Sequence, residues 1–239
     1  MPGELKTCTI KREGNGPHYR WKAYLTYVFE EKTSVFIEDE RDPVGIDLGL
    51  DNVVVASEYT EFPNSRHLLK AESKVARIQR KMSSFEKDSE GWIKCKQSLY
   101  HAFIRLKNVR RAERYEIVNW IVRNFNNIGM EDLEIQKLLD KSLGKGMRKS
   151  YRDASWRMLL DALCTKAAEA GCIVVKVNPA YSSQLCSQCG RLVPKDLSVR
   201  RHVCTCGLDT GRDRNGALNV LRWSLPAMHL KECEMERFL

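Results

Sequence analysis

Four cysteines near the C-terminus form two close pairs, and each pair is followed directly by a glycine. Cys186 and Cys189 make a C-x-x-C pair, and Cys204 and Cys206 make a C-x-C pair. Thiolates at this kind of spacing hold a tetrahedral Zn²⁺ in zinc ribbons, and four of them leave no open position for catalysis. The pattern therefore predicts a structural zinc site. His202 is an alternative ligand in place of one cysteine, although a surface position on the ribbon is the simpler interpretation.

Three carboxylates that are far apart in the sequence form a second candidate site: Asp47, Glu131 and Asp213. The first ends "VGID", the second follows "NIGM", and the third opens a helix-like run after the cysteines. Taken singly, they are equally typical of a turn residue, the first turn of a helix and a helix N-cap. Taken together, they indicate a site for Mg²⁺ or Mn²⁺, because like charges gather favourably only around a cation. A pair of such ions can activate water and stabilise the leaving oxygen of a phosphodiester.

The elements that must position these residues alternate between strands and helices. A strand enters Asp47, another ends at Glu131, and a buried run "CIVVKV" precedes the cysteines. The other expected elements are a hairpin around "REGNGP", a return strand "VVVAS", two helices over about 66–126 broken at "SSFEKDSEGW", a loop "DKSLGKGMRKSYRD", a helix over about 154–170 and a short helix "DRNGALNVLRW". Such an order predicts a mixed α/β sheet covered by helices.

Composition limits the class of protein. The 239 residues are 43% hydrophobic, which is enough for a folded core, and the formal net charge of +9 favours a polyanionic partner such as nucleic acid. No run approaches the roughly 20 apolar residues of a membrane span, and the first residues are not of signal-peptide type. We therefore expect a cytoplasmic protein with no membrane partner. In that reducing compartment, paired cysteines favour metal over disulfides.

Several stretches, in this order, resemble the C-terminal half of TnpB (OrfB) proteins. These are transposon-encoded, RNA-guided nucleases related to the type V CRISPR effectors. The resemblance extends from about Pro43 to Trp223 and rests on the following stretches: "VGIDLGL", "EDL", "SYRDASWRMLLDALCTKAAEAGCIVVKVNPAYSSQLCSQCG" and "CTCGLDTGRDRNGALNVL".

The resemblance implies an α/β fold, namely an RNase H-like (RuvC) domain with an inserted helical hairpin and a zinc ribbon. It divides the chain into a partial, wedge-like β segment at 1–42, a RuvC-like nuclease domain at 43–183, a zinc ribbon that binds target nucleic acid at 184–208, and a last helix with a tail at 209–239. The long helical hairpin lies at about 66–126 within the nuclease domain.

The resemblance also implies an activity and a set of cofactors. Asp47, Glu131 and Asp213 become the catalytic residues of a DNA endonuclease and the ligands of two Mg²⁺ (or Mn²⁺) ions. The four cysteines become the ligands of a structural Zn²⁺. The implied partners are DNA and a guide RNA, and the implied setting is a transposable element.

The chain departs from the family pattern at several positions. Gly211 and Gly216 replace an Asp and an Ala, and Tyr115 and Glu116 lie near the usual place of a His-Lys pair. The first 42 residues resemble only the last strands of the wedge domain, so we expect a minimal or N-terminally truncated form. A second chain or a homodimer is expected to supply the recognition region. The alternative is a catalytically weak or inactive nucleic-acid-binding protein, either a regulator or a truncated transposase-like fragment.

Overall fold

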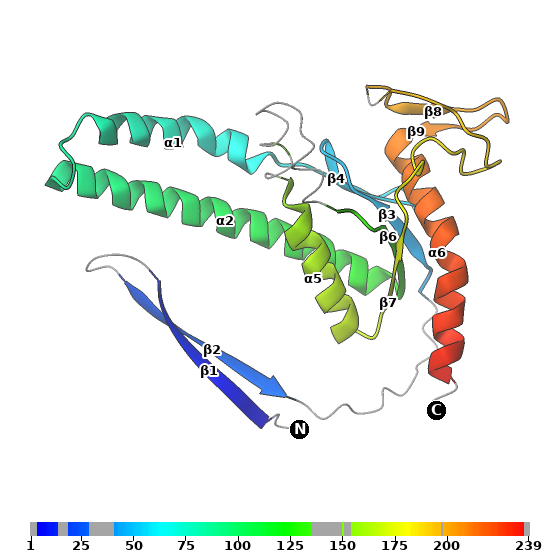
Figure 1. Cartoon of the computed structure of the whole chain (residues 1–239), viewed down its shortest axis with the longest axis horizontal. Helices are drawn as coiled ribbons and strands as arrows, with labels where there is room; N and C mark the ends of the chain where they lie inside the picture. Colours follow the sequence, from blue (N-terminus) through cyan, green and yellow to red (C-terminus); the bar gives the residue numbers. More distant parts are fainter. Residues whose placement is uncertain are drawn as a thin grey trace. The chain divides into compact units, whose positions relative to one another are not determined.

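The computed structural model describes residues 4–13, 19–28, 41–134, 150, 154–196 and 198–236, with side chains described as far as residue 229. The chain divides into two compact units, residues 1–38 with 77–101 and residues 39–76 with 102–239 (Figure 1). Within the described part of the chain, every helix is too short or too polar to cross a bilayer.

The first unit contains an antiparallel hairpin and the tip of a helical pair. Strands β1 (Glu4–Glu13) and β2 (Arg20–Val28) pair from end to end, which confirms the predicted hairpin. Most of its predicted turn lies outside the described residues. Helices α1 (His67–Ser83) and α2 (Glu90–Asn124) run from this unit into the second, and residues 84–89 between them are not helical. The two predicted helices and their break are therefore confirmed.

The second unit is built on a five-stranded mixed sheet with the order β5-β4-β3-β6-β7. Its strands are β3 (Val44–Asp47), β4 (Asn52–Ala56), β5 (Glu61–Pro63), β6 (Asn127–Glu131) and β7 (Ile173–Val177). β3, β4 and β5 form an antiparallel meander, whereas β6 and β7 run parallel to β3. Parallel neighbours require long crossovers, and α2 and α5 (Trp156–Glu169) provide them. The predicted mixed α/β sheet is confirmed.

Alternation along the strands decides which face each side chain takes. In β3, Val44 and Ile46 are fully buried in the main core with apolar residues of α2 and α5. Gly45 and Asp47 alternate with them and so point to the opposite face, where helix α6 (Arg212–Glu236) packs against β3 and β6. The large apolar core thus lies on one face of the sheet, and Asp47 points to the other, where α6 lies against the strands. Figure 1 shows the sheet between α6 and the pair α2 and α5.

Three features differ from the sequence-based predictions. Strands β5, β8 (Arg201–Val203) and β9 (Asp209–Gly211) were not predicted, because each has only three residues. The last helix was predicted to end near Trp223 but continues through Pro226. Ser224 and Met228 on either side of the proline are buried, so packing overrides the helix-breaking tendency. The predicted loop at 140–153 lies almost wholly outside the described residues.

Candidate metal centres

Asp47 and Glu131 are brought together by strand register. β3 and β6 are parallel neighbours in which Gly45 pairs with Gly129 and Ile46 pairs with Met130. Continuing this register places Asp47 beside Glu131, each as the last residue of its strand. Neighbouring strands lie about 4.8 Å apart, so two carboxylates separated by more than 80 residues become adjacent. No helix begins at Glu131 in the described segment, and the helix-start interpretation of this residue was wrong.

A pair of glycines lets α6 lie directly on the sheet. A Cβ atom on Gly45 would come within 2.1 Å of the Ala217 carbonyl oxygen, and one on Gly129 within 2.4 Å of the Ser224 Oγ. Both contacts are shorter than any real packing distance, so only glycine fits under the helix. This close approach brings the N-terminal turn of α6, with Asp213 in it, over the carboxyl ends of β3 and β6.

The three carboxyl groups interact electrostatically. Burial raises the pKa of Asp47 well above its ordinary value, and the charges of Glu131 and Asp213 raise it further, while Arg212 opposes them. Burial also raises the pKa of Glu131, against a hydrogen bond from the Ser182 side chain that lowers it. Repulsion of this kind is relieved when a cation binds between carboxylates, and oxygen donors suit Mg²⁺ or Mn²⁺.

Arginines contact Asp213. The Arg212 Nε lies 3.0 Å from one Asp213 carboxylate oxygen, and an Arg200 Nη lies 3.9 Å from the other. Arg200 also pairs with Asp51 at 2.7 Å, in the turn after β3. The candidate site therefore carries cationic groups at its margin, which can compensate its charge or meet a phosphate.

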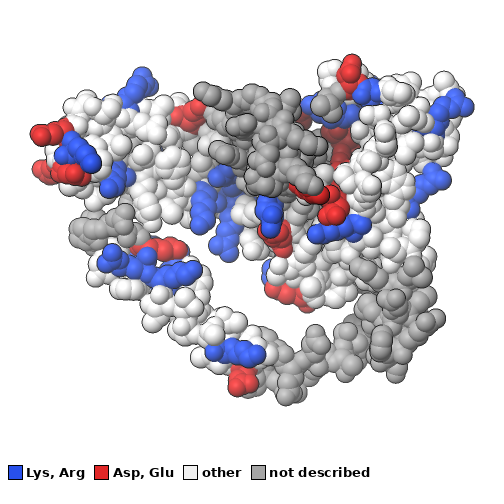
Figure 2. All heavy atoms as spheres, in the orientation of Figure 1, with Lys and Arg blue, Asp and Glu red and all other residues white. Residues whose placement is uncertain are grey.

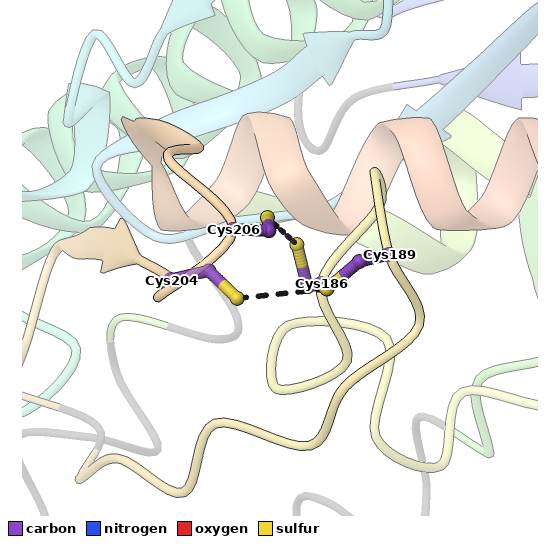
Figure 3. Close-up of side chains that lie close together, drawn as sticks. All are labelled: Cys186, Cys189, Cys204 and Cys206. Carbon is purple, nitrogen blue, oxygen red and sulfur yellow. Dashed lines mark hydrogen bonds between the residues drawn. The ribbon is translucent and has the colours of Figure 1, made fainter.

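The four cysteines form a compact cluster, as Figure 3 shows. Their four sulfur atoms all lie within 4.8 Å of one another. Among the described residues, no other group of three or more His, Cys, Asp or Glu side chains is gathered in this way, and this includes the three carboxylates. The Cys186 and Cys206 sulfurs lie 3.6 Å apart, as do those of Cys189 and Cys204. Four Zn–S bonds of about 2.3 Å in a tetrahedron require sulfur separations of about 3.8 Å, so the cluster fits Zn²⁺ closely.

Left-handed glycines shape both halves of the cluster. Gly190 and Gly207 have φ values of +74° and +97°, conformations that an L-residue rarely adopts.

The pKa values of the Cys204 and Cys206 thiols are shifted in opposite directions. The backbone N–H of Cys206 and hydrogen bonds from the other thiols lower the pKa of Cys204 to about 7. The N–H of Leu208 acts to lower the pKa of Cys206, but burial and the neighbouring sulfurs outweigh it and raise that pKa to about 12.

His202 is neither a ligand of the cluster nor a surface residue. Its ring is fully buried in β8, and its Nδ1 atom is hydrogen-bonded to the Lys195 ammonium. The proposed ligand role and the expected surface position were both wrong. In a three-residue strand, alternation alone decides which side chain faces inward, and the sequence does not reveal this short strand.

Two buried asparagines tie the cysteine segment to α6. Asn219 donates hydrogen bonds to the carbonyl oxygens of Ser182 and Leu185, at 2.8 and 2.7 Å. Asn215 donates to Leu185 at 2.7 Å and accepts the N–H of Ser187 at 3.0 Å. The sequence shows both asparagines four residues apart on the helix, a spacing that places them on one face, but it does not reveal what they bind. They hold the segment that leads into Cys186.

Two family models match adjacent parts of the chain. The OrfB family model, described as a probable transposase, matches residues 28–142. The model described as the Cas12f1-like TNB domain matches residues 156–220, which include α5, the cysteine cluster and the start of α6.

Relatives align along nearly the whole chain. The putative RNA-guided DNA endonuclease InsQ of Escherichia coli K12 is 28% identical over 235 residues, which cover 92% of this chain and 57% of that protein. A putative RNA-guided DNA endonuclease of Streptomyces pristinaespiralis is 31% identical over 226 residues, which cover 94% of this chain and 54% of that protein. The chain therefore spans about half the length of the curated relatives it matches.

A solved structure shares the fold. The cryo-EM structure of a Cas12f1–sgRNA–target DNA complex matches with a TM-score of 0.53 and 21% identity, over 77% of this chain and 51% of that one. At this identity the likeness concerns the fold alone. With both family models and with relatives aligned along nearly its whole length, the chain belongs to the OrfB (TnpB) family.

Proposed function

We propose that this protein is a TnpB-type, metal-dependent DNA endonuclease of a transposable element, guided by RNA or descended from a guided enzyme. The observation that carries the proposal is the meeting of Asp47 and Glu131 at the ends of adjacent parallel strands, under the helix turn that holds Asp213. An RNase H-like (RuvC) arrangement is our interpretation of this sheet. The two relatives, each described as a putative RNA-guided DNA endonuclease, support the same activity.

In this proposal the three carboxylates hold two Mg²⁺ ions, or Mn²⁺ in their place, through their oxygen atoms. The bound ions would supply Lewis-acid stabilisation of the phosphate and a more acidic water. Asp47 and Glu131 provide rigid ligands because both end buried strands, and Glu131 is further held by Ser182. Arg200 and Arg212 lie where they can face a phosphate oxygen. The expected products carry 5′-phosphate and 3′-hydroxyl ends.

The cysteine cluster is proposed to hold a structural Zn²⁺, and residues 184–208 to form a ribbon that contacts target nucleic acid. The remaining divisions at 1–42, 43–183 and 209–239 are proposed as a wedge-like segment, a nuclease domain and a final helix with a tail.

The net charge of +9 supports DNA and guide RNA as partners. Lys and Arg occur with Asp and Glu between them on the visible face (Figure 2). A second chain or a homodimer remains a prediction, and the apolar side chains exposed on β1 and β2 suit such a contact.

A nucleic-acid-binding protein with little or no cleavage is the second candidate. The contacts of Asp213 with Arg200 and Arg212 favour it, because a carboxylate that is already paired with guanidinium groups is a weaker metal ligand. Removal of Arg200 separates the two candidates: Arg200→Ala should strengthen Mn²⁺ binding if the pair competes with the ion.

The deciding experiment begins with purification of the chain from its host and sequencing of any bound RNA. The complex is then incubated with single- and double-stranded DNA, with and without Mg²⁺. Glu131→Gln should lower cleavage at least about 100-fold, while folding and DNA affinity stay close to those of the wild type. Glu134→Gln is the matched control, because this exposed carboxylate lies three residues further along and outside the site.

The outcomes separate the alternatives. Cuts that follow the sequence of a bound RNA support a guided nuclease, and Mg²⁺-dependent cuts without RNA support an unguided one. Folded protein that binds DNA but does not cut it would favour the binding-only candidate. Unchanged cleavage by Glu131→Gln would contradict the assigned site.

A further inference from the structure

Two exposed tyrosines near the carboxylates adopt backbone conformations that are unusual for such large residues. Tyr59 and Tyr181 are 72% and 60% exposed, with φ values of +96° and +64°. Single exposed aromatic residues are ordinary on protein surfaces. A left-handed backbone at a bulky L-residue is not ordinary, because its Cβ approaches the backbone, and glycine or asparagine adopts this conformation at lower cost. Such strain persists where the surrounding structure fixes it, and it gathers at functional sites.

Tyr59 is fixed in the turn between β4 and β5. The Ala56 N–H donates to the Thr60 carbonyl oxygen at 2.8 Å, and the Tyr59 N–H donates to that of Ala56 at 3.3 Å. The Arg214 guanidinium carbon lies 3.1 Å from the centroid of the Tyr59 ring. Arg214 directly follows Asp213 in the first turn of α6. One face of the ring is therefore covered by a cation beside the carboxylates, and most of the rest is open to solvent.

Tyr181 is fixed equally well, on the side of the site where Glu131 lies. Its carbonyl oxygen accepts the N–H groups of both Gln184 and Leu185, each at 2.9 Å. The next residue, Ser182, is buried, and its carbonyl oxygen accepts the Asn219 hydrogen bond. Through Ser182 this turn also reaches Glu131. Tyr181 is thus one residue in sequence from a group that contacts Glu131, and the ring of Tyr59 packs against Arg214, which is one residue in sequence from Asp213.

Rigid, exposed aromatic rings, one of them packed against an arginine, are suited to bases of an unpaired strand. In a duplex both faces of each base are already stacked, whereas a single strand offers them to protein side chains. We propose that Tyr59, backed by Arg214, and Tyr181 stack on bases of a single DNA strand led to the Asp47, Glu131 and Asp213 site. This inference rests on the proposed function and names how its substrate is held.

The test measures binding in the absence of divalent ions other than zinc, using fluorescence anisotropy and the zinc-loaded full chain. The probes are a labelled 12-nucleotide oligothymidylate, an abasic strand of equal length and charge, and an oligouridylate. Tyr59→Ala and Tyr181→Ala should each weaken oligothymidylate binding by about 5- to 100-fold. Tyr→Phe at either position should restore affinity to within about twofold, since stacking needs the ring and not the hydroxyl. Binding of the abasic strand should not change.

Two controls distinguish stacking from a structural role. Tyr100→Ala removes an exposed tyrosine on α2, far along the chain from the site, and should leave all affinities unchanged. Tyr181→Asn should bind oligothymidylate as weakly as Tyr181→Ala but melt at the same or a higher temperature, because asparagine tolerates the left-handed backbone. A lower melting temperature would indicate that the ring serves folding and would overturn the inference.

The other possible outcomes of the binding measurements also test the inference. If the wild type binds oligothymidylate no more tightly than the abasic strand, and the alanine variants match it, the stacking inference fails while nucleic-acid binding stands. If the wild type binds no strand at all, the proposed function fails with it. If the alanine variants lose affinity for oligouridylate alone, the two rings would be assigned to RNA, and the assignment to a DNA strand would be overturned.

Discussion

At the scale of single residues, the candidate site consists of acids that the fold makes costly to ionise. Asp47 is partly buried and Glu131 is buried, and burial is the largest cause of the raised pKa of each. Gly216 keeps space free beside this acid, since a Cβ atom there would lie 3.3 Å from the Asp47 carboxyl carbon. The alanine common in the family at this position would press on that carboxylate. A glycine here weakens the helix by about 1 kcal/mol but leaves room for the acid.

The raised pKa of Asp47 predicts how stability depends on pH. The folded protein keeps this proton at pH values where the unfolded chain has lost it. Stability from this group is therefore fully present below the ordinary pKa of an aspartate and is lost as the pH rises through the raised folded pKa. Asp47→Asn should raise the free energy of unfolding at pH 7 by about 1–2 kcal/mol without Mg²⁺, and by little near pH 4.

Urea denaturation of the zinc-loaded protein at pH 4, 5.5 and 7 checks this prediction. Asp132→Asn, an exposed neighbour of Glu131, is the matched control and should change stability little at any of these pH values. A less stable Asp47→Asn protein at pH 7 would show that this carboxylate is stabilised, rather than strained, in the fold.

At the scale of elements, the contact between α6 and the sheet decides whether there is a site. The glycine pair in β3 and β6 removes two side chains at the crossing, and the backbone of α6 fills the space. Around Gly45 the obstacles are backbone atoms of Ala217 and Leu221, whereas around Gly129 they belong chiefly to the Ser224 side chain. The two glycines should therefore respond differently to a compensating change.

Gly129→Ala should lower the free energy of unfolding by about 1–3 kcal/mol through overpacking. Because Ser224 is the main obstacle, adding Ser224→Gly should recover about 1 kcal/mol relative to the sum of the single changes. Gly45→Ala should cost at least about 3 kcal/mol, and Ser224→Gly should not relieve it. A thermodynamic cycle by chemical denaturation measures both couplings. Equal couplings at the two glycines would contradict this account of the crossing.

At the scale of the whole molecule, the two candidate metal centres share one scaffold. The segment from Ser182 to Ser187 leads into the cysteine cluster, and Asn215 and Asn219 of α6 hold it. The same helix carries Asp213 over the sheet. The cysteine cluster is therefore not an independent appendage but is hydrogen-bonded to the helix that completes the carboxylate site.

Zinc binding to the cluster should depend strongly on pH, because each thiol must lose its proton to bind the metal. Cys204, with its pKa near 7, is already partly ionised at neutral pH, whereas Cys206, with its pKa near 12, loses its proton only to the metal. The apparent Zn²⁺ affinity should rise at least about tenfold per pH unit between pH 6 and 7. Competition with a chromophoric chelator measures it.

Cysteine variants provide the controls for this measurement. Cys189→Ser should release zinc and loosen the segment before it, while Cys8→Ser, an exposed cysteine of β1, should keep one zinc per chain. Affinity that does not vary with pH, or stoichiometric zinc in Cys189→Ser, would contradict the assignment of the cluster.

Features that depend on local spacing could be predicted from the sequence alone. Cysteine pairs with their glycines, the alternation in "VGID" and the apolar periodicity of the long helices are local patterns, and they predicted the cluster, the strands and the helical pair. The sequence also singled out Asp47, Glu131 and Asp213, but with local interpretations of each still open.

Features that depend on strand register and packing become visible in the folded protein and have no local signal in the sequence. Strand pairing places Asp47 beside Glu131, and two glycines admit α6. Burial of the residues around Pro226 lets α6 continue through this proline, and the His202 side chain is fully buried. The left-handed backbones of Tyr59 and Tyr181 likewise carry no sequence signal, since nothing local favours a tyrosine there. The strand register, the contact with α6 and the burial share one physical reason: contacts between residues far apart in sequence fix each of them, and no short window of sequence contains both partners.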